Sequence, residues 1–308
     1  MTTREDIEAA AARIAGRVRT TPVIELERGA LGPHPPVALK LELLQHTGSF
    51  KPRGAFNRIF SNRVPEAGVI AASGGNHGAA VAYAGQQLGH RAEIFVPSPT
   101  PQVKVERLRQ YGAHVTVTGS SYAEALAAST ERARYSGALV VHAYDQPEVL
   151  AGAGTVGREF DEQATGLETL FVAVGGGGLI GGVAAWYAGR ARVIGVEPER
   201  CPTLARALEA GGPVDVDVAG LAVDSLGARR IGEVMFPIAQ RYVERVVLVT
   251  DDQIRRAQRL LWDHLRVLAE PGGATACAGL LFGGYRPRET ERVGVIVCGG
   301  NTEPALFR

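Results

Sequence analysis

Short apolar segments of strand length alternate with segments of helical length along most of the chain, and this alternation limits the fold more than any other feature. The expected strands lie at residues 37–43, 68–72, 92–96, 114–118, 138–142, 170–174, 192–196, 246–249 and 293–297. The expected helices include residues 78–88, 101–111, 122–135 and 252–268. Strands joined through helices require right-handed crossovers, so the sequence predicts an α/β fold of mainly parallel sheets flanked by helices.

Size and charge exclude several classes of protein. The 308 residues exceed what one compact core usually organises, so we expect one large domain or two lobes. A net charge of +1, from 33 basic and 32 acidic residues, gives no electrostatic case for a nucleic-acid or anionic-membrane partner. Because no apolar run reaches about 18 residues, we expect no transmembrane helix.

Three separated cysteines favour a reducing, cytoplasmic setting. Cys201, Cys277 and Cys298 are odd in number and lack both zinc-ligand spacing and the pattern of a disulfide framework. The first residues also differ from a signal peptide, because Thr3 to Asp6 is typical of a helix start with acidic residues in its first turn.

The first of four turns that could carry chemistry surrounds Lys51. Pro52 suits the first turn of a helix, which places Lys51 beside a helix N-terminus. The partial positive charge there disfavours a second cation and lowers the pKa of the amine, as imine formation with a carbonyl requires. The alternative is an ordinary solvated lysine in a polar loop.

The second turn runs from Ser73 to Gly78, between an apolar strand and a helix. Its glycines let several backbone N–H groups point into one space, which suits a small carboxylate or phosphate. Asn76 could add a hydrogen bond to a ring hydroxyl. His77 could be a base, a ligand contact or only a residue of the helix start.

The third turn contains four consecutive glycines, Gly175, Gly176, Gly177 and Gly178, before another helical segment. Backbone amides and the helix dipole make it a candidate phosphate cradle. A rival interpretation remains open here. Gly176, Gly178 and Gly181 also satisfy G-x-G-x-x-G, and Glu197 follows the next strand, as in a dinucleotide-binding unit.

The fourth turn, Cys298 to Asn301, follows the last expected strand. Ligands of open α/β sheets bind at the carboxyl ends of strands, so Cys298 is a candidate site residue. The alternative is a small buried apolar filler, the commoner role of such a cysteine.

In this order the turns resemble those of fold-type II pyridoxal-phosphate enzymes, in the serine/threonine dehydratase (ammonia-lyase) and serine racemase branch. The matching segments are residues 40–42, 47–55, 73–78, 152–155, 175–178, 196–198, 270–274 and 298–301. The resemblance implies a two-lobed fold like that of the tryptophan synthase β-subunit, and a homodimer. Residues 1–63 and 146–308 would form the large cofactor-binding domain, and residues 64–145 the small one.

The resemblance also implies the roles of individual residues. Lys51 would hold pyridoxal 5'-phosphate as a Schiff base and later move the substrate's α-proton. Phe50 would pack against the cofactor ring, Asn76 would bond its 3'-oxygen, Cys298 would face the pyridine nitrogen, and Glu270 would lie nearby. The phosphate would be held by Gly175, Gly176, Gly177 and Gly178. The substrate carboxylate would be surrounded by Ser73, Gly75, Asn76 and His77.

The implied activity is β-elimination of L-threonine and/or L-serine to a 2-oxo acid and ammonia. Open alternatives are dehydration of another β-hydroxy amino acid such as 3-hydroxyaspartate or an aryl serine, serine racemisation, cofactor binding without turnover, and a nicotinamide-dependent oxidoreductase. The candidate wall of the side-chain pocket comprises Ala143, Tyr144, Asp224 and Ser225.

Four departures from the family pattern refine this expectation. Gly74 replaces the serine that protonates the opposite face in racemases, and neutral Cys298 supports a long-lived carbanion poorly, so both favour elimination. Thr203 replaces the aspartate of a divalent-cation site that would include Glu197, so we expect no comparable metal site. Ala153 replaces a more usual glutamine, with no evident consequence. Because the chain ends seven residues after Asn301, we expect no regulatory domain and no feedback by isoleucine.

Overall fold

Two sheets organise the part of the chain that the computed structural model describes, residues 1–32 and 34–303. The larger sheet has the order β1-β2-β10-β7-β8-β9 and the smaller one β5-β4-β3-β6. The larger comprises β1 (Val23–Leu26), β2 (Val37–Lys40), β7 (Thr169–Ala173), β8 (Arg192–Pro198), β9 (Val243–Val249) and β10 (Val293–Ile296). The smaller comprises β3 (Val69–Ala72), β4 (Ala92–Val96), β5 (His114–Val117) and β6 (Leu139–Val140).

Parallel pairing dominates both sheets. Central strand β10 pairs in parallel with β2 and β7, with Val293 opposite both Val37 and Thr169. Only the edge strand β1 runs antiparallel among the pairs of the described residues, where Val23 lies opposite Lys40. Strands buried on both faces are expected to be continuously apolar, as β7 and β10 are. The predicted α/β class with mainly parallel sheets is therefore confirmed.

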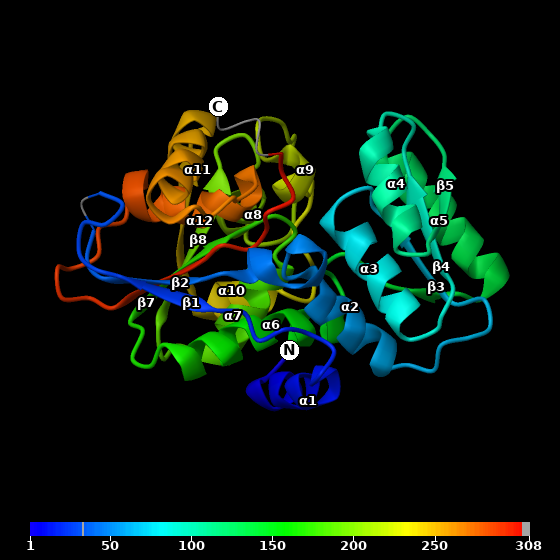
Figure 1. Cartoon of the computed structure of the whole chain (residues 1–308), viewed down its shortest axis with the longest axis horizontal. Helices are drawn as coiled ribbons and strands as arrows, with labels where there is room; N and C mark the ends of the chain where they lie inside the picture. Colours follow the sequence, from blue (N-terminus) through cyan, green and yellow to red (C-terminus); the bar gives the residue numbers. More distant parts are fainter. Residues whose placement is uncertain (33, 304–308) are drawn as a thin grey trace.

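Helices cover both faces of each sheet. In Figure 1, α11 and α12 lie on one side of the larger sheet, and α1, α6 and α7 lie on the other. The smaller sheet is flanked by α3, α4 and α5. These helices span α1 (Arg4–Ile14), α3 (Asn76–Gln87), α4 (Gln102–Gln110), α5 (Tyr122–Ser136), α6 (Pro147–Gln163), α7 (Gly178–Tyr187), α11 (Asp251–Leu265) and α12 (Pro271–Phe282). Shorter helices are α8 (Thr203–Ala210), α9 (Val223–Leu226) and α10 (Phe236–Tyr242).

Helix α2 (Lys51–Phe60) lies at the junction of the two sheet units (Figure 1). It contacts α6 beside the larger sheet and α3 beside the smaller one. All strands of the smaller sheet fall between residues 69 and 140, while the boundaries of the two domains stay a prediction. The first helical residue, Lys51, is thereby placed between the two units.

Several element boundaries differ from those expected. The strand predicted for residues 37–43 ends at Lys40, and a 3-10 turn (Glu42–Leu44) follows it. The helix expected to start at Gly78 begins at Asn76, and the one expected to continue to Leu268 ends at Leu265. Edge strand β1 was not predicted.

Two further expectations concern chemistry and membranes. All three cysteines are free and buried, so each is a separate thiol in the described structure. Within the described ranges, we find no helix long and apolar enough to cross a membrane.

Candidate active site

Lys51 is held by a neutral partner at the start of α2. Its Nζ donates a hydrogen bond to the carbonyl oxygen of Ala143 at 2.7 Å. No carboxylate forms an ion pair with this amine among the described residues. Burial lowers the pKa of Lys51 to about 8, because desolvation disfavours the charged form. The amine is therefore ready to react as a nucleophile close to neutral pH.

Phe50 and Cys298 lie immediately beside Lys51. The Phe50 N–H donates to the carbonyl oxygen of Cys298 at 3.1 Å, and Ser49 forms an antiparallel bridge with Gly299. The Lys51 Nζ lies 5.1 Å from the centroid of the Phe50 ring. Burial raises the pKa of the Cys298 thiol to about 12, so the thiol is neutral at physiological pH.

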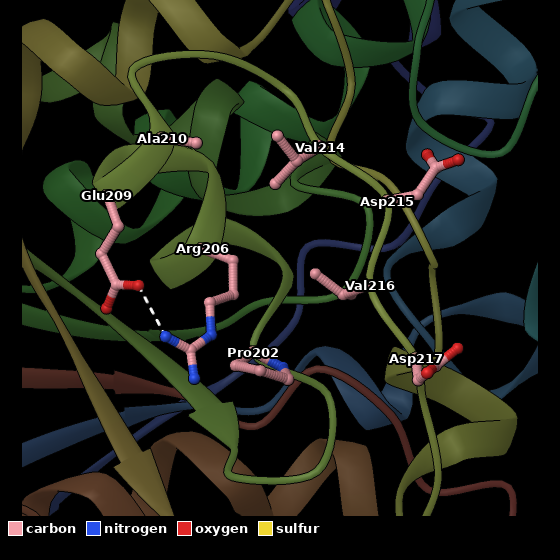
Figure 2. Close-up of a pocket in the computed structure, with 8 residues that line it drawn as sticks. All are labelled: Pro202, Arg206, Glu209, Ala210, Val214, Asp215, Val216 and Asp217. Atoms are coloured by element: carbon pink, nitrogen blue, oxygen red, sulfur yellow. Dashed lines mark hydrogen bonds and ion pairs between the residues drawn. The ribbon is translucent and has the colours of Figure 1, made fainter.

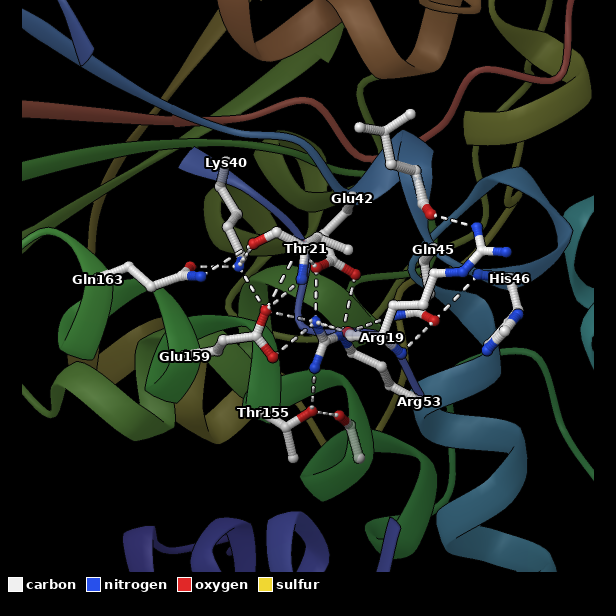
Figure 3. A network of polar contacts seen from close by, with 12 residues as sticks. Arg19, Thr21, Lys40, Glu42, Gln45, His46, Arg53, Thr155, Glu159 and Gln163 are labelled. Carbon is white, nitrogen blue, oxygen red and sulfur yellow. Dashed lines mark hydrogen bonds and ion pairs between the residues drawn. The ribbon is translucent and has the colours of Figure 1, made fainter. Parts of the chain in front are cut away.

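A buried ionic network fixes α2 next to Lys51 (Figure 3). Arg53 donates to both carboxylate oxygens of Glu42, at 2.9 Å and 2.7 Å, and also contacts Glu159 at 3.0 Å. Glu159 in turn pairs with Lys40 at 2.5 Å. Two cations thus face two carboxylates, and the rigid fork of Arg53 restricts the orientation of the helix that carries Lys51.

Asn76 and Glu270 are brought together from opposite halves of the sequence. The Nδ2 of Asn76 donates to Glu270 Oε1 at 2.6 Å, and its Oδ1 accepts from Asn301 Nδ2 at 2.5 Å. Burial raises the pKa of Glu270 to about 7, opposed in part by the hydrogen bond from Asn76. Both side chains lie against Gly299, next to Cys298 in the chain.

The turn that begins at Ser73 lies between β3 and the first turn of α3. The Gly75 N–H donates to Ser73 Oγ at 3.2 Å, so it must leave this partner to bind a carboxylate. His77 Nε2 lies 2.8 Å from the Val141 carbonyl oxygen, which only accepts, so Nε2 carries the proton. Burial lowers the pKa of His77 to about 3, which keeps the ring neutral.

The four-glycine turn connects β7 to the N-terminus of α7. Gly177 adopts φ 89°, a left-handed conformation that favours glycine. A Cβ at Gly176 would collide with the ring of Tyr144, and one at Gly177 would lie 2.7 Å from Met235 Sδ. The turn therefore presents bare backbone at a helix N-terminus, where N–H groups lack partners within the helix.

The candidate wall residues divide into two groups. Ala143 contacts Lys51, and Tyr144 covers the glycine turn, so this short segment connects the two parts of the site. Asp224 instead pairs with Lys104 at 2.7 Å and is largely exposed, and Ser225 packs against Gly272. The Asp224 backbone nevertheless borders the Ser73 turn, since a Cβ at Gly75 would lie 3.6 Å from its carbonyl oxygen, and the role of these four residues as a side-chain pocket stays a prediction.

Glu197 serves as a helix cap. Its two carboxylate oxygens accept from the N–H groups of Leu204 at 2.7 Å and Ala205 at 3.0 Å, in the first turn of α8. The hydroxyl of Thr203 donates to the Ala228 carbonyl oxygen at 2.7 Å. No group of three or more His, Cys, Asp or Glu side chains suited to a metal occurs in the described residues.

A separate hollow of about 600 Å³ lies on the surface at α8 (Figure 2). Its lining includes Arg206 and Glu209, which pair at 2.7 Å and are both exposed. None of the site residues predicted from the sequence lines it. The chemistry at Lys51 does not involve this hollow.

The residues gathered at Lys51 fit pyridoxal 5'-phosphate. A partly buried amine of lowered pKa suits its aldehyde, and a glycine turn at a helix N-terminus suits its phosphate. The neutral thiol of Cys298 suits an unprotonated ring nitrogen. Each of these groups is chemically suited to a different part of the cofactor.

Two polar residues of the site were missed by sequence reasoning. Arg107 donates to Asn301 Oδ1 at 2.6 Å and to the Thr47 carbonyl oxygen at 3.1 Å. Asn301 was part of a recognised turn, but no role followed from its position. Arg107 gave no signal, since it lies in an ordinary amphipathic helical segment.

Comparison with known proteins identifies the family. The model described as "Pyridoxal-phosphate dependent enzyme" matches residues 14–299. A phenylserine dehydratase of Ralstonia pickettii is 38% identical over 314 residues, covering 99% of this chain and 96% of that protein. The biosynthetic L-threonine dehydratase of Pasteurella multocida (strain Pm70) is 40% identical over 249 residues, covering 79% of this chain but only 48% of that longer enzyme.

A solved structure supports the same assignment. Maize serine racemase superposes with a TM-score of 0.92 at 32% identity, covering 99% of this chain and 95% of that one. The match extends over both sheets and the turns between them, so the similarity is not confined to one lobe. This chain belongs to the pyridoxal-phosphate dependent enzymes of fold type II.

Proposed function

We propose that this enzyme converts L-threonine and/or L-serine to a 2-oxo acid and ammonia, with Lys51 as the residue that carries the cofactor. The β-hydroxyl leaves as water, and hydrolysis of the released enamine takes up one water and frees the ammonia. The observation that carries the proposal is the partly buried Lys51 amine, whose hydrogen bond within the described ranges goes to a carbonyl oxygen and which lies near Phe50 and Cys298. The similarity to a threonine dehydratase and a phenylserine dehydratase supports a β-hydroxy amino acid as substrate.

The residues around Lys51 divide the work of the reaction. Bound pyridoxal phosphate supplies an electron sink for negative charge at the substrate Cα. Lys51 Nζ would hold the cofactor and, as a free amine, would take the Cα proton of the substrate, because its lowered pKa keeps it available as a base. The carbonyl oxygen of Ala143 orients this nitrogen.

The substrate carboxylate is assigned to the turn containing Ser73, Gly75, Asn76 and His77. Backbone N–H groups at the start of α3 attract an anion, and the neutral His77 ring adds no competing charge. Asn76 Nδ2, whose hydrogen bond Glu270 accepts in this structure, is assigned to the 3'-oxygen of the cofactor. The phosphate is assigned to the turn Gly175 to Gly178.

Two features favour elimination over racemisation. The thiol of Cys298 is neutral, so it does not hold a proton on the ring nitrogen or prolong the life of a carbanion. Gly74 offers no acid on the face opposite Lys51, and the space next to it is filled by Thr100. Prompt loss of the β-hydroxyl tolerates both conditions.

An aryl serine is the second candidate substrate. Its support is the phenylserine dehydratase similarity, which extends over 99% of this chain, together with the aromatic ring of Tyr144 beside the glycine turn.

We also propose a cytoplasmic homodimer with the domain boundaries given above. The alternative function as a nicotinamide-dependent oxidoreductase is disfavoured. It would need Glu197 to bind a ribose, but both carboxylate oxygens of Glu197 accept hydrogen bonds from α8.

The test is a visible absorption spectrum of the purified protein, recorded before and after addition of L-threonine, L-serine or phenylserine. We expect a yellow protein whose band is lost in Lys51→Ala, with 2-oxo acid released from the preferred substrate. A protein that stays colourless with added pyridoxal phosphate would contradict the proposal. Relative kcat/KM for the three substrates decides between the two candidates.

A further inference from the structure

A line of four side chains crosses from helix α4 to the cofactor site. Arg107 Nη1 donates to Asn301 Oδ1 at 2.6 Å, and Asn301 Nδ2 donates to Asn76 Oδ1 at 2.5 Å. Asn76 Nδ2 then donates to Glu270 Oε1 at 2.6 Å. Each amide in the line accepts on one side and donates on the other, so the orientation of one determines the orientation of the next.

Two groups at the Arg107 end set the direction of this line: Arg107, which only donates, and the carbonyl oxygen of Thr47, which only accepts and takes a hydrogen bond from Asn301 Nδ2 at 2.9 Å. An arginine side chain only donates, so Asn301 must turn its oxygen toward Arg107 and its nitrogen toward Asn76. The other end cannot set the direction, because a carboxyl such as Glu270, whose pKa burial raises to about 7, can accept or donate. With Arg107 and the Thr47 carbonyl oxygen in place, the Nδ2 of Asn76 faces Glu270.

Arg107 and Asn301 also bind the strained turn that precedes Lys51. The carbonyl oxygen of Thr47 accepts from Arg107 Nη2 at 3.1 Å and from Asn301 Nδ2 at 2.9 Å. Thr47 has φ 61° and ψ 8°, a left-handed conformation that is costly for a β-branched residue. Among the described side chains, its buried hydroxyl is one of those with no hydrogen-bond partner. The strain therefore persists because the surroundings hold this turn.

We infer that Arg107 and Asn301 are positioning residues. They orient Asn76 so that its Nδ2 donor points toward the cofactor, and they hold the turn that leads into Lys51. The inference rests on the proposed roles of Asn76 and Lys51. Arg107 lies on α4 beside the smaller sheet, while Asn301 and Thr47 lie near the carboxyl end of β10 and the start of α2. The line thus ties the cofactor site to the packing of one sheet unit against the other.

Asn301→Asp tests the direction of the line, since it keeps the shape and the acceptor for Arg107 but removes the Nδ2 donor. Asn76 must then turn its own Nδ2 toward the new carboxylate, which points its oxygen at the cofactor. Arg107→Met removes the donors at the far end, and Arg107→Lys retains a side chain that only donates. Arg109→Met, an exposed residue on the same helix, is the matched control.

The measurements are pyridoxal phosphate affinity, by titration of the cofactor-free protein, and the absorption maximum of the bound cofactor. We expect Asn301→Asp and Arg107→Met to weaken affinity about tenfold and to shift the maximum, Arg107→Lys to fall between, and Arg109→Met to match wild type. Thermal unfolding of the cofactor-free variants monitors folding. If Arg107→Met does not fold, the Arg107→Lys and Asn301→Asp spectra carry the test.

Two results separate this inference from the proposed function. A wild-type protein that never binds pyridoxal phosphate at Lys51 overturns the proposed function itself. A yellow, active wild type whose Asn301→Asp and Arg107→Met variants keep its affinity and absorption maximum overturns only the positioning role. Equal loss of thermal stability without any change in affinity or spectrum means a purely structural role, which also overturns it.

Discussion

The Nζ of Lys51 donates to the carbonyl oxygen of Ala143 at 2.7 Å, a partner that carries no charge. A carboxylate at this position would favour the protonated amine and raise its pKa, whereas burial against a carbonyl lowers it to about 8. The contact therefore orients the nitrogen without suppressing its nucleophilicity.

Cofactor capture by the cofactor-free enzyme should follow the pKa of Lys51. Only the neutral amine attacks the aldehyde, so we expect the rate to increase with pH and to reach half its limit at about pH 8. An unperturbed lysine, with a pKa of about 10.4, would reach half its limit more than two pH units higher. Stopped-flow absorbance of the forming band measures the profile, with a free lysine derivative as the reference. A profile that superposes on this reference would show that the site does not lower the pKa.

Gly74 and Thr100 predict how racemisation could be introduced. A Cβ on Gly74 would lie 2.8 Å from Thr100 Cγ2 and 3.3 Å from its Oγ1, so Gly74→Ser alone must displace that side chain. Thr100→Ala removes both atoms. We expect the double variant to form D-serine from L-serine, and wild type and Thr100→Ala to form little.

Chiral analysis of the residual serine, alongside 2-oxo acid release, measures this prediction. Thr100→Ala alone is the control for the loss of packing. The interpretation of Gly74 fails if wild type already forms D-serine as fast as it deaminates L-serine. It fails equally if the double variant keeps elimination without any D-serine.

Local sequence pattern predicted the sheets but not all of their edges. Strands such as β7 are buried on both faces and are continuously apolar, which makes them visible in the sequence. Edge strand β1 is short and mostly half-buried, and polar Glu25 interrupts its apolar residues, so its four residues carried no comparable signal. The expected strand through residue 43 ends at Lys40, and Glu42 in the 3-10 turn that follows pairs with Arg53, a partner that the apolar pattern of the strand does not reveal.

The candidate site likewise has features that the local sequence reveals and contacts that it does not. Glycine turns at strand ends are local features, so the turns at residues 73–78 and 175–178 could be located from the sequence, while their binding roles stay a prediction. The contact of Ala143 with Lys51 spans 92 positions, and that of Arg107 with Asn301 spans 194. Such partners are determined by how the two sheet units pack together, and no spacing rule along one segment contains that information.

Cys298 should behave as a neutral group. Burial raises the pKa of its thiol to about 12, so very little thiolate exists at neutral pH. We expect iodoacetamide to leave Cys298 unmodified in the folded enzyme, measured by mass spectrometry of its peptide, and Cys298→Ser to retain most of the elimination rate. If Cys298 faces the ring nitrogen as proposed, Cys298→Asp places a charge against it and should reduce that rate. Rapid alkylation at neutral pH would mean that a thiolate is present.

Replacing Arg53 should lower the free energy of unfolding more than replacing an exposed arginine, because it leaves a buried carboxylate without its partner. In Arg53→Met the carboxylate of Glu42 stays fully buried, without its two-pronged partner. Breaking a buried pair in this way costs about 3–5 kcal/mol, whereas an exposed pair is worth about 1 kcal/mol or less. Urea titration of the free energy of unfolding measures the loss, with Arg206→Ala, which removes the exposed pair with Glu209, as the control.

A second substitution separates lost charge compensation from lost packing. Glu42→Gln in the Arg53→Met background removes the stranded charge, so we expect the double variant to be more stable than Arg53→Met alone. The recovery follows from the desolvation cost of an unpaired carboxylate, which a neutral amide of the same shape does not incur. If Arg53→Met costs no more than Arg206→Ala, or Glu42→Gln gives no recovery, the network does not stabilise α2 through its charges, and Lys51 must be held in place by packing alone.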